Sequence, residues 1–165
     1  AIGKIFSEIN PVGGKEKGKA VLLILERTGN RLDEVFYVGD SIPAVDAFDL
    51  VRKEGGMTLS FNGNRYALRA AEIACLSHHA SILALLADVF RKGGREGVMD
   101  MVDRWALDSI PSFGIDPDLV ERVASTSSEG YPKFYRITDE NREMIIRESE
   151  AFRKKVRGVS VGSLG

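Results

Sequence analysis

The chain has 165 residues, of which 44% are hydrophobic and 28% charged, and these values are typical of a soluble globular protein with one sizeable core. Its 23 Lys and Arg residues nearly balance its 24 Asp and Glu residues, so no overall charge favours a nucleic acid or an anionic membrane. We therefore predict no nucleic-acid partner and no membrane partner. The single cysteine, Cys75, excludes an internal disulfide and predicts a reducing compartment, with the cytoplasm as the default location.

The first half of the chain alternates between predicted helices and predicted strands. The apolar run Ala20–Leu25 predicts a buried helix over residues 16–28, which Gly29 and Asn30 end. Apolar strands are predicted over residues 35–40, 57–61 and 73–76, with helices over residues 41–53 and 66–71 between them. This alternation predicts an α/β fold with a small, parallel, Rossmann-like sheet and helices on both of its sides.

The second half of the chain shows helical periodicity only. Apolar spacing predicts helices over residues 81–91, 95–107, 117–123 and 138–155, with Asp116 and Pro117 as the start signal of the third. We therefore divide the chain into an α/β core over residues 1–80, a helical C-terminal extension over residues 81–157 that packs on it, and a flexible tail over residues 158–165.

The stretch Val35–Ser41 is the first candidate for chemistry. Its apolar residues run into Gly39 and Asp40, so the strand is expected to deliver the Asp40 carboxylate to the carboxyl edge of the sheet, where open α/β sheets bind ligands. A carboxylate there suits Mg²⁺, which prefers oxygen ligands and is usually shared with phosphate and water. The alternative is an acid that only caps the following helix, and Ser41 is a further candidate for that cap.

A cluster of lysines, Lys15, Lys17 and Lys19, surrounds the start of the predicted helix 16–28. A lysine at this position can reach over the sheet edge and neutralise a phosphate. The alternative is an ordinary solvated helix start.

Taken together, these segments resemble the C-terminal half of a haloacid dehalogenase-like (HAD) phosphatase, most closely that of archaeal members. The resemblance covers about residues 10–80 and rests on Lys17–Val21, Asp33–Ser41 and Met57–Asn64. It implies that Lys17 stabilises the phosphoryl intermediate, with Lys19 as the fallback, and that Asp40 binds Mg²⁺. It also implies that Ser41 and Asn64 border a small phosphorylated substrate.

The chain departs from the family pattern in two ways. The second metal-binding acid of the family falls near Ala44 or Val45, and the nearest acid here, Asp46, comes slightly late. The Asp-x-Asp pair that supplies the nucleophile has no counterpart before Lys17, and Asp116–Asp118 has the spacing without a preceding apolar strand. The leading hypothesis is a Mg²⁺-dependent phosphatase completed by upstream or partner residues. The alternative is a non-catalytic HAD-like fragment, regulatory subunit or binding module.

Three other patterns have weaker interpretations. Residues 13–20 nearly spell a nucleotide-binding P-loop, but Ala20 lacks the hydroxyl that this motif places on Mg²⁺. The pair His78 and His79 follows the third strand, and without an acid nearby in the sequence we favour an ordinary loop over a metal site. Cys75 is predicted to be a small core residue and not a nucleophile.

A final prediction concerns partners. A sheet that lacks half of its strands exposes apolar edges, which invite pairing with another chain. We therefore expect the isolated chain to be a homo-oligomer or to need a partner chain that completes the sheet.

Overall fold

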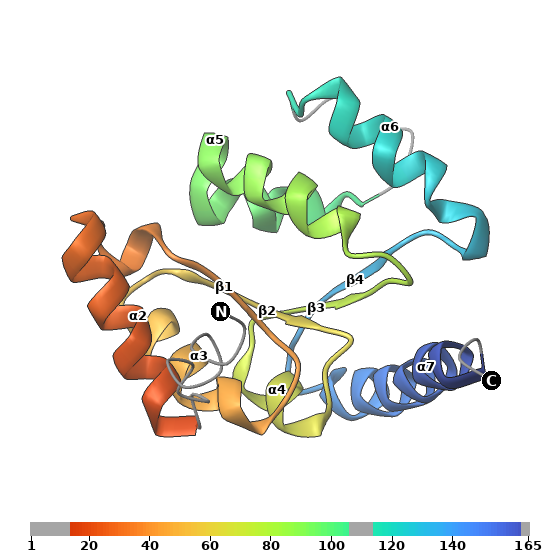
Figure 1. The fold of residues 1–165 in the computed structure, drawn as a ribbon, viewed down its shortest axis with the longest axis horizontal. Coiled ribbons are helices and arrows are strands. Elements are labelled where there is room, and N and C mark those ends of the chain that lie inside the picture. The colour runs from red at the N-terminus through yellow and green to blue at the C-terminus, as the bar shows by residue number, and fades with distance from the viewer. Residues whose placement is uncertain (1–13, 106–113, 163–165) are drawn as a thin grey trace, which may run out of the picture.

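The computed structural model describes residues 14–105 and 114–162. Their secondary structure follows the predicted order over most of the chain, and the elements run through Figure 1 from red to blue. In chain order they are α2 (Gly14–Thr28), β1 (Phe36–Gly39), η2 (Ile42–Ala44), α3 (Val45–Lys53), β2 (Met57–Phe61), α4 (Arg65–Ala70), β3 (Ile73–Leu76), α5 (Ser81–Asp103), α6 (Pro117–Ser125), β4 (Lys133–Arg136) and α7 (Arg142–Gly162). Short 3-10 turns also lie at Leu32–Glu34 and Ser127–Glu129.

The sheet has four strands in the order β1-β2-β3-β4. The first three are parallel, with Phe36 opposite Met57 and Leu59 opposite Ile73, and β4 is antiparallel to β3. The α/β class and the mostly parallel sheet are therefore confirmed. The prediction of a purely helical extension is wrong, because residues 133–136 form an edge strand of the same sheet.

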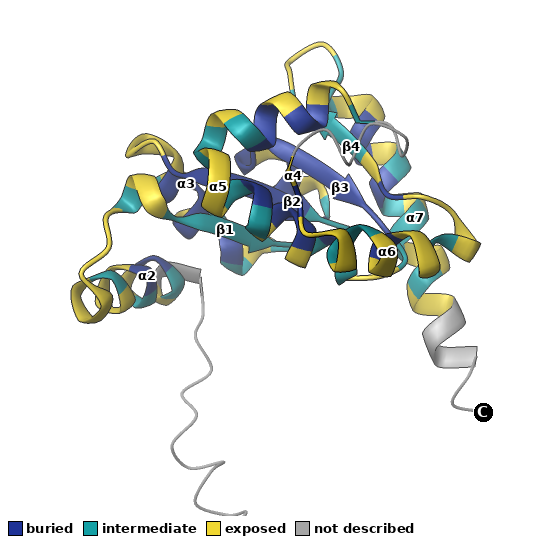
Figure 2. Cartoon of the chain, turned by 90° about the horizontal axis from the view of Figure 1, so that it is seen from above, coloured by how far each residue is buried: buried dark blue, intermediate teal, exposed yellow. Residues whose placement is uncertain are grey.

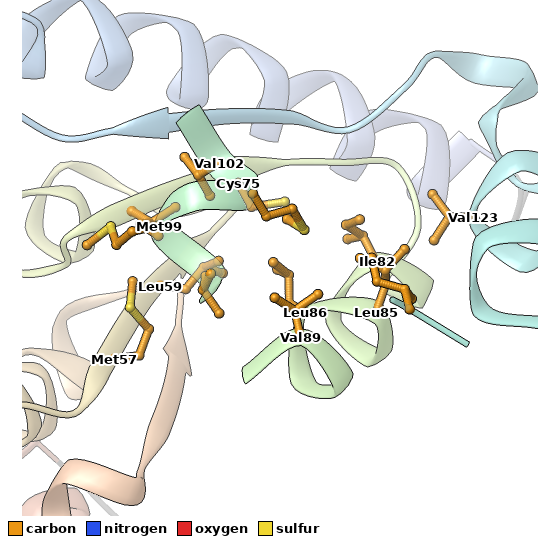
Figure 3. Packing of buried hydrophobic residues seen from close by; sticks show 14 residues of the cluster. Met57, Leu59, Cys75, Ile82, Leu85, Leu86, Val89, Met99, Val102 and Val123 are labelled. Atoms are coloured by element: carbon orange, nitrogen blue, oxygen red, sulfur yellow. The ribbon is translucent and has the colours of Figure 1, made fainter. Parts of the chain in front are cut away.

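Helices cover both faces of the sheet, as Figure 1 shows, with α5 and α6 on one face and α3, α4 and α7 on the other. The larger core lies under α5, where side chains from the strands meet side chains from the helix (Figure 3). Fully buried members of this core are Met57, Leu59, Ile73, Cys75, Ile82, Leu85, Leu86, Val98 and Met101. The residues predicted as a helical extension thus bury the sheet and continue its core.

Helix α5 joins two segments that the sequence predicts as separate helices. Gly94 lies inside it with φ 59° and ψ −157°, a conformation outside the helical region that glycine adopts at low cost. The predicted break at Gly93 and Gly94 is therefore present as a kink. At the other end of the chain, α7 continues to Gly162, so the stretch predicted as a flexible tail begins as helix.

Helix α2 has the predicted bounds, but the prediction that it is buried is wrong. Leu22, Leu23 and Ile24 are 47%, 49% and 59% exposed, and Val21 is buried against α3. The reason is its place in the fold: α2 packs mainly on α3 and η2, so only the side of α2 that faces them is covered. Figure 2 shows α2 as a largely exposed helix at one end of the molecule.

None of the helices within residues 14–105 and 114–162 combines the length and the apolar character needed to cross a lipid bilayer.

Candidate functional site

The candidate site lies at the carboxyl edge of the sheet, where Asp40, Asn62 and Ser77 follow β1, β2 and β3. Hydrogen bonds tie these loops together. The backbone N–H of Asn64 donates to the Asp40 carbonyl at 2.9 Å, and the Asn62 amide and the Ser77 backbone bond each other at 2.8 and 2.9 Å. Asn62 has a φ of 46°, a left-handed conformation that asparagine tolerates better than most residues. The edge is therefore held by backbone groups together with the side chain of Asn62.

Asp40 accepts bonds from both sides of its carboxylate. The Ser41 hydroxyl donates to Oδ1 at 2.8 Å, and Arg153 Nη1 lies 3.0 Å from Oδ2. Arg157 of the same helix, α7, lies 3.9 Å from Oδ2. The predicted helix cap by the Ser41 side chain is absent from the turn that follows, because that hydroxyl is turned to Asp40.

Arg153 is fixed by more than its ion pair. Its Nη1 also donates to the backbone carbonyls of Asp40 at 3.0 Å and Asn62 at 2.8 Å, and its side chain is only 15% exposed. The carboxylate of Asp40 is 50% exposed and the side chain of Arg157 is 66% exposed. One guanidinium is thus held inside the edge of the sheet, while the other faces solvent.

A pocket of about 230 Å³ opens above these groups. Its lining consists of Asp40, Phe61, Asn62, Arg153, Val156 and Arg157. A second pocket shares Arg153 and Arg157 and adds Glu150 and Lys154, and the carboxylate of Glu150 is held by Arg65 at 2.9 Å. The three cationic side chains of the two linings outnumber their two carboxylates, so the region attracts anions.

Lys17 lies partly buried in the first turns of α2, whose side packs against η2 and α3. Its neighbour Gly18 lies against the start of α3, since a Cβ placed on it would be 3.9 Å from the carbonyl oxygen of Asp46. Helix α2 therefore borders the turn that follows Asp40 and Ser41. Lys17 itself is not among the residues that line the pocket.

The residues present do not fit the Mg²⁺ that the resemblance implies. Asp46 lies exposed in the first turn of α3 and is not part of the pocket lining. Across the described parts of the chain, no three His, Cys, Asp or Glu side chains are arranged to hold a metal ion. Asp40 is the acid at the strand end, and arginine already occupies its outer oxygen. We therefore derive no step through a metal ion.

Asn64 shapes the loop after β2. Its Oδ1 accepts bonds from the backbone N–H groups of Tyr66 and Ala67, so this side chain caps α4. Gly63 before it has no room for a side chain, because a Cβ would lie 1.9 Å from the Ser60 hydroxyl. The predicted Gly63–Asn64 turn thus borders the pocket loop, and its observed contacts are structural.

Sequence reasoning missed Arg153 and Arg157, which it placed in the helical extension over residues 81–157 without a functional role. The available signal was their spacing of four residues, which places both guanidinium groups on one side of a helix. The sequence did not indicate that this side faces Asp40, which is 113 positions away from Arg153.

The histidine pair does have an acid nearby, contrary to our expectation from the sequence. Glu129 Oε2 lies 3.5 Å from His78 Nδ1 and 3.7 Å from His79 Nε2, and the His78 ring packs against Phe152 of α7. The contacts of the two histidines with Glu129 join the loop after β3 to the turn after α6.

Two further interpretations are settled by local structure. Cys75 is buried in β3, and burial raises the pKa of its thiol, so its prediction as a core residue is confirmed. The P-loop interpretation is wrong, because α2 begins at Gly14 and residues 14–19 are helical. A P-loop would need these residues in an open turn around a phosphate.

Comparison with known proteins gives a fold likeness. No protein-family model matches the chain, and no curated protein matches it. Among solved structures, gene product AF1437 from Archaeoglobus fulgidus superimposes with a TM-score of 0.68 and 24% sequence identity. The match covers 96% of this chain and 43% of the other, so this chain spans less than half of that protein's length. The likeness shows a shared α/β fold.

Proposed function

We propose that this chain binds a small phosphorylated molecule at the carboxyl edge of its sheet, as the C-terminal half of a HAD-like module. The observation that carries the proposal is the convergence of Arg153 and Arg157 on the strand-end pocket beside Asp40. Guanidinium groups bind phosphate oxygens with paired, charge-assisted hydrogen bonds. Open α/β sheets bind their ligands at this edge.

Arg157 is the group best able to contact such a ligand. Its side chain is 66% exposed, and its contact with Asp40 Oδ2 is long, at 3.9 Å. Arg157 can therefore turn to an incoming phosphate at little cost. Arg153 supplies fixed positive charge beneath it. The apolar side chains of Phe61 and Val156 leave room in the same pocket for the organic part of the ligand.

The test is titration of the chain with phenyl phosphate, followed by calorimetry or by amide shifts in NMR spectra. Loss of one charge-assisted contact weakens binding by about tenfold, so we expect that effect from Arg157→Ala. Arg147→Ala is the matched control, because Arg147 is exposed on the same helix and lines neither pocket. Equal affinities of the two variants, or no binding by the unaltered chain, would refute the proposal.

Phosphate-ester hydrolysis is the second candidate function. The observation in its favour is that α2, which carries Lys17, packs against the turn directly after Asp40 and Ser41. We propose measuring the hydrolysis of an aryl phosphate with and without Mg²⁺, on the unaltered chain and on Asp40→Asn. Turnover that requires the metal and disappears in the variant would establish a phosphatase, whereas ester binding without turnover would establish a binding module.

Within residues 14–105 and 114–162, no strand pairs with the outer edge of β1, and this edge supports a proposal about assembly. Phe36, Tyr37 and Val38 of β1 are apolar or aromatic and only partly buried, and α2 beside them exposes three aliphatic side chains. Apolar residues on both sides of a strand are typical of an interior position. We propose that a second copy of the chain covers this edge, and a monodisperse monomer in solution scattering would contradict it.

The proposed location is the cytoplasm, where phosphorylated small molecules are available and a thiol such as Cys75 stays reduced.

A further inference from the structure

A cation lies beside the Asp40 carboxylate, directly after the end of β1. The resemblance places Mg²⁺ at Asp40, whereas the structure has a guanidinium there. We propose that Arg153 is the resident cation of this site, so that Asp40 is closed to divalent metals and the pocket binds its ligand without one.

The geometry of Arg153 supports a permanent position. One nitrogen, Nη1, donates to the Asp40 and Asn62 carbonyls and also pairs with the Asp40 carboxylate. The two carbonyls follow β1 and β2, so strand ends set the position of the guanidinium even without the carboxylate. A surface ion pair would lack this second, uncharged set of acceptors.

Helix α7 is also anchored around Arg153, which keeps that side chain from swinging away. The buried Ser149 hydroxyl donates to the Gly63 carbonyl at 2.6 Å, and Glu150 pairs with Arg65. One turn away, the ring of Phe152 packs on His78 at 4.8 Å between ring centres. The three contacts tie α7 to the loops after β2 and β3 and to the start of α4.

A metal ion at Asp40 would meet this fixed charge. Mg²⁺ binds carboxylate oxygen at about 2.1 Å, and the Arg153 nitrogen already lies 3.0 Å from Oδ2. The dication and the guanidinium would then be neighbours on one oxygen, in a place where Arg153 is mostly shielded from water. Repulsion between like charges is strong in such surroundings, so the two cations exclude each other.

The test uses Mn²⁺ as the probe, with its binding followed by electron paramagnetic resonance in the absence of any phosphate. We expect the unaltered chain and Asp40→Asn to bind Mn²⁺ equally weakly. Arg153→Met removes the charge and keeps the length of the side chain, so it should bind Mn²⁺ at least about tenfold more tightly. The gain should vanish in the double variant with Asp40→Asn, and Arg147→Met should show none.

Two results would overturn the inference. One is Mn²⁺ binding by the unaltered chain that Asp40→Asn abolishes, and the other is a folded Arg153→Met variant with no gain in affinity. If Arg153→Met does not fold, the comparison of the unaltered chain with Asp40→Asn still decides whether Asp40 is open to metal.

The ligand part of the inference rests on the proposed function and has a separate measurement. Phenyl phosphate should bind the unaltered chain equally well with Mg²⁺ and with a chelator, and binding that requires the metal would overturn this part. Absence of ester binding under both conditions would refute the proposed function alone, because the Mn²⁺ measurement involves no phosphate.

Discussion

Two carboxylates at opposite ends of the sheet pair with arginine, and they differ in burial. Glu72 directly precedes β3 and is 8% exposed, with Arg95 on one oxygen and the Thr58 hydroxyl on the other. Asp40 directly follows β1 and is 50% exposed, with Arg153 on one oxygen and Ser41 on the other. The same pair of partners, an arginine and a hydroxyl, therefore occurs once inside the fold and once at a pocket.

The difference indicates separate roles. A buried carboxylate that loses its partners is costly, so the Glu72 cluster is expected to stabilise the fold. The hydrogen bond to Glu72 also raises the pKa of Arg95, in line with a close pair. A half-exposed carboxylate gains little from pairing, so Asp40 adds little to stability, and the exposed Arg157 beside it is free to contact a ligand.

The largest expected effect on stability comes from removing the Glu72 carboxylate, and removal of the Asp40 carboxylate is the comparison. Glu72→Ala leaves Arg95 and Thr58 without their partner and should lower the free energy of unfolding by about 3 kcal/mol. Asp40→Ala should lower it by less than about 1 kcal/mol, because that carboxylate is half exposed and Arg153 keeps two backbone carbonyls as acceptors. Urea denaturation followed by circular dichroism measures both. Equal losses would show that burial does not separate the two sites.

The position of Asp40 could be predicted from the sequence because its cause is local. An apolar run that ends in Gly39 and Asp40 specifies a strand and the acid at its end, and β1 confirms both, although its four residues are only partly buried. Gly39 itself is required there, since a Cβ would lie 2.4 Å from the Cβ of Ala44. The alternation of helices and strands likewise gave the parallel order of β1, β2 and β3.

The partners of both carboxylates could not be predicted, because they come from distant parts of the chain. Arg95 is 23 positions from Glu72, and Arg153 is 113 positions from Asp40. The edge strand β4 was missed for a related reason. Its four residues are partly exposed or exposed and include two charged side chains, so only pairing with β3 makes the segment a strand.

The exposure of α2 is another property that could not be predicted from the sequence. An apolar run such as Ala20–Leu25 specifies a helix with much apolar surface, but it does not specify what covers that surface. Among the described residues, α3 covers one side of α2 and leaves Leu22, Leu23 and Ile24 exposed. Burial depends on which strand forms the sheet edge, and periodicity carries no information on that.

The two hydroxyl partners offer a second, smaller test of the comparison. Thr58 is fully buried, donates to Glu72 and accepts from its backbone N–H, so Thr58→Val should cost about 1.5 kcal/mol of stability. Ser41→Ala should cost about 0.5 kcal/mol or less, because its carboxylate partner remains in contact with water. Both values follow from urea midpoints. A larger loss for Ser41 would mean that Asp40 also stabilises the fold.

Salt should separate the two sites without any substitution at the pocket. Exposed charges are screened at high ionic strength, so phenyl phosphate should bind several-fold more weakly at about 0.5 M salt than at about 0.05 M. The stability difference between the unaltered chain and Glu72→Ala should change by less than about 0.5 kcal/mol, since buried pairs are screened much less. Calorimetric titrations and denaturation curves at both salt concentrations check these expectations.

A third carboxylate, Asp88 of α5, tests whether an ion pair away from both sites affects stability. Lys92 and Arg91 hold its oxygens at 2.7 and 2.9 Å, and the hydrogen bonds from Lys92 and then Arg91 lower its pKa to about 2. The pKa of Asp88 in the folded chain lies below the ordinary value of 3.8, so Asp88 stabilises the fold fully above about pH 4 and stops doing so as the pH falls through 2. The same pair also joins α5 to the start of α6, because Lys92 donates to the Gly114 carbonyl and Asp88 accepts from the N–H of Asp116.

Acid should therefore weaken the contact between α5 and α6. We expect the urea midpoint of the unaltered chain to fall more between pH 5 and pH 3 than that of Asp88→Asn, whose side chain has no carboxylate to protonate. The effect should be smaller than that of Glu72→Ala, because the guanidinium of Arg91 is mostly exposed to water. Equal shifts in the two proteins would mean that other carboxylates determine the acid sensitivity of the fold.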